Sequence, residues 1–327
     1  MPSSLLNTPA VGELLRHAAQ KAALAPSVHN TQPWRFRLTG NTLELRTDRS
    51  RQLTALDPTG RQLMISAGCA LFNARVALAA AGCRTDVQRL PEPADPDLLA
   101  ILTARPATAA AGIGTLHAAI DRRQTNRRRF SSDRVPAELV EELVAAAAAE
   151  GAALFEISRE EHRIATAVLS QQADAEQNAS PAYRAELRAW TSDDPTRRDG
   201  VSASAVPHVD ASAGDDIPIR DFDSRGTGWL PAETRSSMYQ CLLLLTTADE
   251  SPLGWLTAGE ALERIWLTAT DRGYALSLLT QVVEVARTRE QLRATLDLTS
   301  HPLVLLRIGT AAITPSSLRR PLAELMD

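Results

Sequence analysis

The stretch APSVHNTQPW, residues 25–34, is the most specific segment of this 327-residue sequence, and the rest of the chain is best interpreted outward from it. Pro26 and Pro33 stiffen the segment because a proline ring fixes one backbone dihedral. The residues between them include Ser, His, Asn and Gln, whose side chains donate hydrogen bonds. Such a loop suits a planar ligand with polar edges. The alternative is a rigid connection between a helix and a strand, with Trp34 buried in the core.

The flanking sequence predicts a first unit of helices and strands. Apolar residues from Leu14 to Ala25 recur at helical spacing and predict an amphipathic helix that ends before Pro26. Asp57-Pro58 resembles an N-cap followed by proline at the first helical position. The other predicted elements are a hairpin over 35–46 that turns at Gly40-Asn41, a buried central helix over 59–81, strands over 85–90 and 98–103, and a linker over 104–114.

The second part of the chain predicts the same order of strand, loop, helix and strand. Its predicted elements are helices over 117–125 and 136–149, a strand over 238–245, a loop over 249–256, a helix opened by the capping box 257–260 and ended by Gly273, a strand over 274–279, a helix over 290–296 and a strand over 303–308. An internal duplication explains this recurrence, and a chance recurrence of a common order is the alternative.

Two clusters of arginine with small hydroxyl residues complete the set of motifs. They are RRQTNRRRF, residues 122–130, and SSLRRPL, residues 316–322. The guanidinium group offers a planar fork of donors that suits a phosphate. Solvated faces and ion-pair partners are the commoner roles of such clusters. Two clusters that converge on one anionic group would favour phosphate binding.

Together the three motifs resemble the nitroreductase family of flavoproteins, and in particular its Acg-type branch, where one chain imitates the usual homodimer. The resemblance implies an α+β, nitroreductase-like fold, an internal pseudo-dimer of two fused halves with mixed or antiparallel sheets and long central helices. The halves would span residues 1–110 and 111–327. Residues 191–232, rich in Asp, Ser, Pro and Gly, would form a lid-like loop in the second half.

The resemblance also implies an FMN site at the junction of the halves. The loop would contact the isoalloxazine ring, Arg123 and Thr125 the phosphate, and Arg127 the phosphate or the N1/O2 edge of the ring. Thr280-Gln281 would offer a backbone N–H near flavin N5, and the C-terminal basic pair, Arg319 and Arg320, would close on the phosphate. The implied cofactor-binding residues are Pro26, Ser27, Val28, His29, Asn30, Arg123, Thr125, Arg127, Thr280, Gln281, Arg319 and Arg320.

The sequence departs from the family pattern in two respects. Between Arg127 and Phe130 there is one residue more than the common spacing, which leaves the alignment of individual arginines open. Neither half carries both types of motif: the second half has Ala149-Glu150-Gly151-Ala152 where the loop motif would recur. The sequence therefore predicts one complete FMN site and one vestigial site.

Composition excludes several other classes. A formal net charge of -4 argues against a nucleic-acid-binding protein. The three cysteines and six histidines show no metal-ligand spacing, so the cysteines are predicted to be reduced core residues of a cytoplasmic protein. Ala23-Leu24-Ala25 imitates a signal-peptidase site, but charged residues precede it instead of an apolar segment. Neither a membrane span nor a GxGxxG fingerprint is expected.

The resemblance to the nitroreductase family implies NAD(P)H-dependent reduction of a nitroaromatic or quinone-like acceptor by hydride transfer through flavin N5. No side chain need act as a catalytic acid or nucleophile, and no triad spacing indicates a hydrolase. A flavin-binding protein that does not turn over, with the lid closed over the ring, is the main alternative. An interaction protein that has lost its ligand is a third. A monomer is expected from the fused design, with weak homo-oligomerisation left open.

Overall fold

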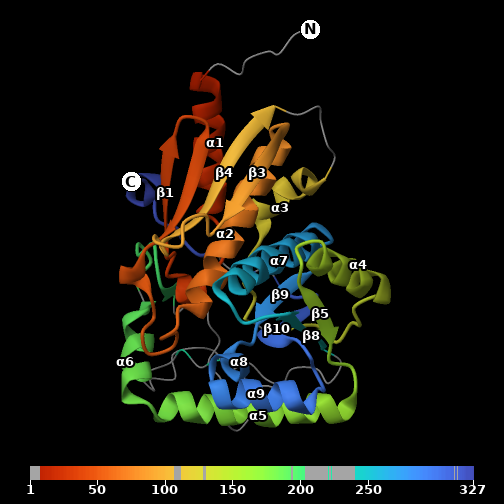
Figure 1. Cartoon of the computed structure of the whole chain (residues 1–327). Helices are drawn as coiled ribbons and strands as arrows, with labels where there is room; N and C mark the ends of the chain where they lie inside the picture. Colours follow the sequence, from red (N-terminus) through yellow and green to blue (C-terminus); the bar gives the residue numbers. More distant parts are fainter. Residues whose placement is uncertain are drawn as a thin grey trace.

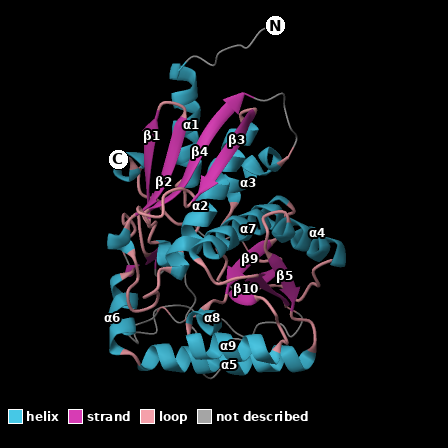
Figure 2. Cartoon of the chain, in the orientation of Figure 1, coloured by secondary structure: helices cyan, strands magenta, loops and turns pink. Residues whose placement is uncertain are grey.

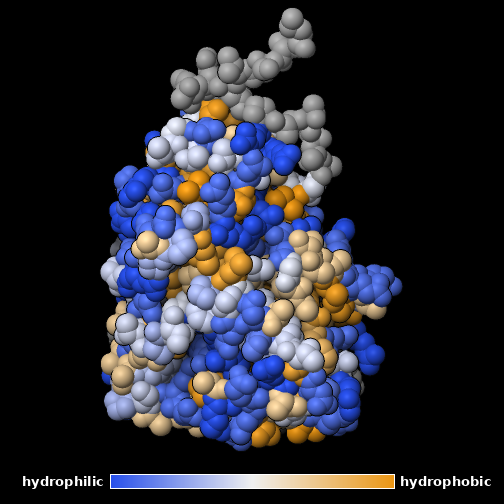
Figure 3. Space-filling view, viewed as in Figure 1, coloured by the Kyte–Doolittle hydropathy of each residue, from blue (hydrophilic) through white to orange (hydrophobic). Residues whose placement is uncertain are grey.

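The computed structural model describes residues 8–106, 112–127, 130–192, 194–202, 220, 222, 240–312, 314 and 316–327. Within them, two four-stranded antiparallel sheets are stacked along the long direction of the molecule, with helices packed between and below them (Figures 1 and 2). Hydrophilic residues cover most of the face that Figure 3 shows, and hydrophobic residues form small groups among them. This is the α+β architecture that the sequence predicts.

The first sheet has the strand order β1-β2-β4-β3. The predicted hairpin is confirmed, with Phe36 opposite Leu45 in an antiparallel register. Trp34 is fully buried at the start of the hairpin. The elements of this half are α1 (Thr8–Ala22), β1 (Trp34–Thr39), β2 (Thr42–Thr47), α2 (Arg61–Ala80), β3 (Cys83–Arg89) and β4 (Leu98–Pro106), with 3-10 turns at Val28–Asn30 and Arg49–Arg51.

The second sheet has the strand order β5-β8-β10-β9, which matches the first sheet strand for strand. Its elements are a 3-10 turn (Ile113–Leu116), α3 (His117–Arg122), α4 (Ala137–Ala148), β5 (Ala153–Glu156), β8 (Cys241–Thr247), α7 (Pro252–Asp271), β9 (Ala275–Leu278), α8 (Gln281–Glu284), α9 (Ala286–Thr295), β10 (His301–Gly309) and α10 (Leu322–Leu325). A repeated topology is what an internal duplication predicts. The division of the chain at residue 110 stays a prediction.

The halves differ in what joins their first two strands. A tight turn joins β1 to β2, whereas the chain between β5 and β8 holds α5 (Glu160–Ala179), α6 (Pro181–Ala189) and the short parallel pair β6 (Thr191–Ser192) and β7 (Val201–Ser202). The sequence analysis predicts neither helix. In Figure 1, α5 runs beside α9 at the far end of the molecule. Most of the predicted lid, residues 191–232, lies outside the described residues.

Two predicted helix starts are wrong. Asp57-Pro58 does not open α2, which begins at Arg61 after a left-handed Gly60; the Asp57 carboxylate accepts a hydrogen bond from Leu63 N at 2.9 Å instead. Helix also replaces residues 252–256 of the predicted loop over 249–256 and the predicted capping box over 257–260. Ser251 caps α7 through Gly254 N at 3.1 Å, and Pro252 occupies the first helical position.

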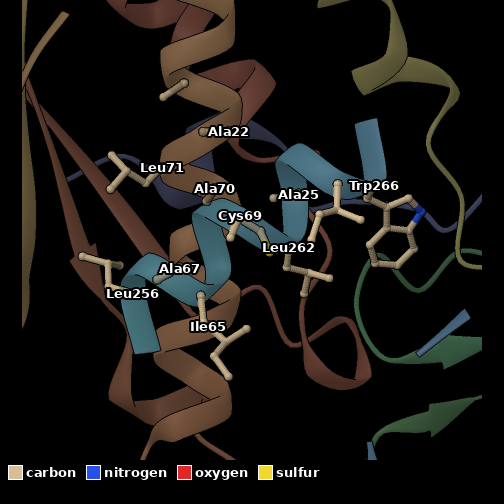
Figure 4. Close-up of a cluster of buried hydrophobic side chains, with 14 of the residues drawn as sticks. Ala22, Ala25, Ile65, Ala67, Cys69, Ala70, Leu71, Leu256, Leu262 and Trp266 are labelled. Carbon is tan, nitrogen blue, oxygen red and sulfur yellow. The ribbon is translucent and has the colours of Figure 1, made fainter. Parts of the chain in front are cut away.

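The two central helices, α2 and α7, cross each other (Figure 4), and a pair of glycines lies where their backbones come closest. A Cβ added to Gly68 would lie 2.8 Å from Gly259 Cα, and one added to Gly259 would lie 2.7 Å from Gly68 Cα. Both helices are 20 residues long, and each glycine is the eighth residue of its helix. The contact is therefore reciprocal, as at an isologous dimer interface. Among the described residues, α2 is the one helix long and apolar enough to cross a membrane, and most of it is buried inside the protein.

Candidate functional site

The loop between α1 and β1 has an unusual backbone. His29, Asn30 and Gln32 adopt left-handed conformations with φ of 47°, 54° and 50°. Residues other than glycine seldom occupy this region, and they persist there where the surrounding structure fixes them, often at functional sites. Two hydrogen bonds from serine side chains help to fix the loop backbone. Ser27 Oγ accepts from Gln32 N at 2.9 Å, and Ser66 Oγ, on α2, accepts from Val28 N at 3.1 Å.

Segments far away in the sequence also fasten this loop. The Asn30 amide donates to the carbonyl oxygens of Gly200 and Leu318, each at 3.1 Å. The Gln32 side chain donates to Arg198 O at 2.8 Å and accepts from Arg320 N at 2.8 Å. The loop is thus held between the start of the predicted lid and the C-terminal segment, which continues to the edge of β1 (Figure 1).

Ser27→Ala is expected to lower the free energy of unfolding by about 1–3 kcal/mol, because it leaves the buried Gln32 N–H without its acceptor. Urea denaturation of the ligand-free protein measures this. Ser50→Ala on an exposed turn is the matched control and should change stability by less than about 0.5 kcal/mol. Equal stability of the two variants would show that the hydroxyl does not hold the loop.

A cavity lies against this loop. Four predicted segments line it: the loop itself, the arginine-rich segment, the segment around Thr280-Gln281 and the C-terminal basic segment. Two further lining residues come from the chain between β7 and β8. The lining consists of Pro26, Ser27, Val28, His29 and Asn30; Thr125 and Arg127; Leu278, Leu279, Thr280, Gln281 and Glu284; Ser317 and Arg319; and Arg220 and Phe222. The sequence analysis therefore named ten of these residues, and it missed Glu284, Arg220 and Phe222 among others. The bond between Asn126 N and Leu276 O, 3.0 Å long, places the arginine-rich segment along β9.

An apolar recess between the central helices adjoins the cavity. Pro26, Ser27, Val28, Leu278 and Thr280 line both spaces. The recess adds Gln62, Ile65, Ser66, Cys69, Leu262 and Val304. Burial raises the pKa of the Cys69 thiol, so this cysteine is protonated and a poor nucleophile at neutral pH. The linings together offer apolar side chains, polar groups and two arginines, which suit a flat apolar ring with a polar edge and an anionic tail.

Two arginines give the cavity an unneutralised positive charge. Burial and the neighbouring Arg220 lower the pKa of Arg127 to about 10. Burial, Arg123 and Arg127 lower the pKa of Arg319 to about 9, against the attraction of Glu263. Both groups stay charged at neutral pH. None of the ion pairs between described residues includes either of them, so an anion in the cavity would relieve their desolvation and mutual repulsion.

Two other arginines named from the sequence lie outside the cavity lining. Arg123 is buried behind the loop, with its guanidinium 4.7 Å from the Trp266 ring centre and 3.4 Å from Glu263. It donates to Leu24 O at 3.1 Å and so holds the end of α1. Arg320 binds the loop through its backbone, and its side chain pairs with Glu324 at 3.3 Å. Phosphate contacts by these two arginines stay a prediction, which their positions do not favour.

The corresponding place in the other half contains ion pairs. Glu260 is the ninth residue of α7, as Cys69 is the ninth residue of α2, and it is 1% exposed. It accepts from Arg75 at 2.7 Å and from Arg89 at 2.6 and 2.9 Å. Glu150, in the turn after α4, accepts from Arg75 and from Arg264 at 2.7 Å. Charged side chains therefore occupy the space that would correspond to the recess.

Comparison with known proteins gives the family of this chain. A family model described as "Nitroreductase family" matches residues 120–310. The Mycobacterium tuberculosis protein "Putative NAD(P)H nitroreductase Rv3131" is 36% identical over 96% of this chain and 91% of its own length. "Putative NAD(P)H nitroreductase acg" of the same organism is 31% identical over 99% of this chain and 97% of its own length. A nitroreductase structure with bound FMN from Desulfitobacterium hafniense aligns with 61% of this chain and 90% of its own, at 13% identity and a TM-score of 0.39, and adds nothing to the assignment. The chain belongs to the nitroreductase family.

Proposed function

We propose that this protein binds FMN in the cavity and acts as an NAD(P)H-dependent oxidoreductase on nitroaromatic or quinone-like acceptors. The observation that carries the proposal is the meeting of the strained loop with Arg127 and Arg319, two enclosed cations without a carboxylate partner among the described residues. The names of the M. tuberculosis relatives support the choice of nicotinamide as electron donor.

The residues of the cavity fit this cofactor. Arg127 and Arg319 would hold the phosphate, and Thr125 and Ser317 lie in the same lining. The apolar side chains of the recess would face the ring. The Gln62 amide nitrogen is buried there without a hydrogen-bond partner among the described residues, and it would donate to a polar edge of the ring. Bound FMN would accept hydride from the nicotinamide and pass the electrons to the acceptor. The protein would supply orientation, charge and exclusion of water.

A second candidate function is FMN binding without turnover. It is favoured by Arg220 and Phe222, which come from the chain between β7 and β8 and line the same cavity. The centre of the Phe222 ring lies 5.4 Å from the Arg127 guanidinium, so the Arg220 and Phe222 side chains occupy part of the space that a nicotinamide would need. If these two side chains stay in place, hydride cannot reach the ring.

Anaerobic mixing of the FMN-loaded protein with NADH, and separately with NADPH, distinguishes the two. Loss of the yellow absorbance supports the oxidoreductase, and its persistence supports sequestration. A purified protein that is colourless and takes up no FMN would contradict both and would indicate a chain that has lost its ligand. The nucleotide that bleaches faster identifies the donor.

One FMN per chain is the expected stoichiometry, because ion pairs around Glu260 fill the corresponding place in the other half. Absorbance titration of a known protein concentration measures the ratio, and light scattering gives the mass of the loaded species. A ratio of two FMN per chain would show that the second place still binds. A monomeric state and a cytoplasmic location are the corresponding expectations for the whole protein.

A further inference from the structure

The cavity contains one histidine whose protonation can be worked out from its neighbours. His29 is 6% exposed, and its Nε2 lies 2.7 Å from Nη1 of Arg220. A guanidinium group has donors only, so Nε2 must accept this hydrogen bond. Burial, Arg220 and Arg127 all lower the pKa of His29 well below its usual value, so the ring is neutral at neutral pH. Its single ring proton must then lie on Nδ1.

Arg220 is itself fixed in this position. It is 9% exposed, and its Nη2 donates to the carboxylate of Glu284 at 2.6 Å. Thr280 and Gln177 each donate to the same carboxylate at 2.7 Å, which orients it toward the arginine. These bonds form a chain from α5 through α8 to the histidine. His29 and Arg220 are buried and the Glu284 side chain is 1% exposed, so the bonds among these three groups are shielded from water.

This series of hydrogen bonds leaves the Nδ1–H group of His29 as the remaining donor of the ring. His29 Nδ1 is buried and has no hydrogen-bond partner among the described residues. His29 lines the cavity, and its ring meets Phe222 edge-on at 5.5 Å between centroids. A buried donor without an acceptor is unfavourable, and a ligand with an oxygen or nitrogen lone pair at that point would remove the penalty.

We propose that Arg220 is a positioning residue that holds His29 in its Nδ1–H form, and that this N–H donates to a carbonyl or nitro oxygen, or a ring nitrogen, of a planar ligand in the cavity. The identity of the ligand rests on the proposed function; the form of the histidine does not. The acceptor atom belongs either to the flavin ring or to the electron acceptor stacked on it. These two sources share the same hydrogen-bond chemistry.

The first test is nitrogen-15 NMR of the ligand-free protein with labelled histidine at neutral pH. The His29 signals are assigned by their disappearance in His29→Asn. The proposal expects a protonated Nδ1 and an unprotonated Nε2. In Arg220→Met/Glu284→Gln, which removes the donor without leaving a buried charge, Nε2 should become protonated. A wild-type Nε2–H form, or a form unchanged in the double variant, would overturn the role of Arg220.

The second test compares His29→Asn with His29→Asp. Both side chains tolerate the left-handed backbone of this position, and only asparagine keeps a donor near the place of Nδ1. If the flavin is the ligand, the asparagine variant should bind riboflavin roughly 3–10-fold more tightly than the aspartate variant. Riboflavin serves here because it lacks the phosphate and so reports on the ring alone.

If the electron acceptor is the ligand instead, riboflavin affinity should be equal and the difference should appear in binding of 4-nitrobenzoate to the oxidised, FMN-loaded protein. Spectral perturbation of the flavin measures that binding without reduction. Equal affinities in both measurements would contradict the donor role of His29. A protein that takes up no flavin would refute the proposed function, while the NMR result would still decide the form of the histidine.

Discussion

Gly259→Ala should reduce the free energy of unfolding by about 3 kcal/mol or more, or prevent the protein from folding. The new Cβ would lie 2.7 Å from Gly68 Cα and closer still to the carbonyl oxygen of Ile65. All of these atoms belong to helix backbone, so they cannot rotate away as a side chain could. Separating the helices would also open the core around Trp266 and Leu262 (Figure 4).

Gly68→Ala should have an effect of similar size, because its Cβ would meet Gly259 Cα and the carbonyl oxygen of Leu256 in the same way. Gly12→Ala is the matched control: Gly12 lies in α1, and a Cβ there would meet nothing within 4 Å. It should stabilise the protein by about 0.4–1 kcal/mol. Chemical denaturation measures all three. A mild effect at Gly259 would show that the helices can move apart and that their crossing is not tight.

Arg127→Met/Arg319→Met should weaken FMN binding by about two orders of magnitude or more. Each charge-assisted contact to a phosphate contributes about 1.5–3 kcal/mol, and the double variant removes both. The ligand-free double variant should stay within about 1 kcal/mol of the wild type in urea, because relief of the repulsion between the two cations offsets the loss of the long hydrogen bonds that Arg319 donates to Ala25 O and Leu24 O. The affinity is measured by quenching of flavin fluorescence.

Two comparisons make this prediction specific. Riboflavin affinity should be nearly unchanged in the double variant, because riboflavin has no phosphate. Arg84→Met, on a side chain that is 76% exposed, should leave FMN affinity unchanged. An equal loss of affinity for riboflavin and for FMN would mean that these arginines act on the ring or on the fold. A loss of FMN affinity in Arg84→Met would mean that the overall charge of the protein attracts the ligand.

The sequence predicts the repeated core of this fold because those elements carry strong local patterns. The hairpin around Gly40-Asn41 and the apolar run of α2 need no tertiary information to be recognised. The start of α7 shows the limit of such patterns. Ser251-Pro252 is as good an N-cap signal as the capping box that follows it, and the choice between them depends on packing. α5 has a mixed exposed face, including Ile164, that hides its helical period.

The same contrast holds for the cavity. The loop, Thr125, Arg127, Thr280, Gln281 and Arg319 are predicted by motif and do line one space. Arg123 and Arg320 belong to the same motifs, but their side chains lie outside the cavity. The sequence could not predict this, because residue spacing does not say which arginine of a cluster points into the cavity. Arg220 and Phe222 lie in a segment without period or motif. They reach the cavity through an ion pair with Glu284 and a ring contact with His29, and no sequence signal could have shown that.

The fastening of the loop by Leu318 and Arg320 has a consequence for biosynthesis. The ribosome makes these two residues, and Arg319 between them, nearly 300 positions after the loop. The two segments cannot meet until residues 318–320 have emerged. Uptake of the proposed cofactor must therefore follow the emergence of these residues, and a nascent chain that has not yet released them should remain colourless however much flavin surrounds it.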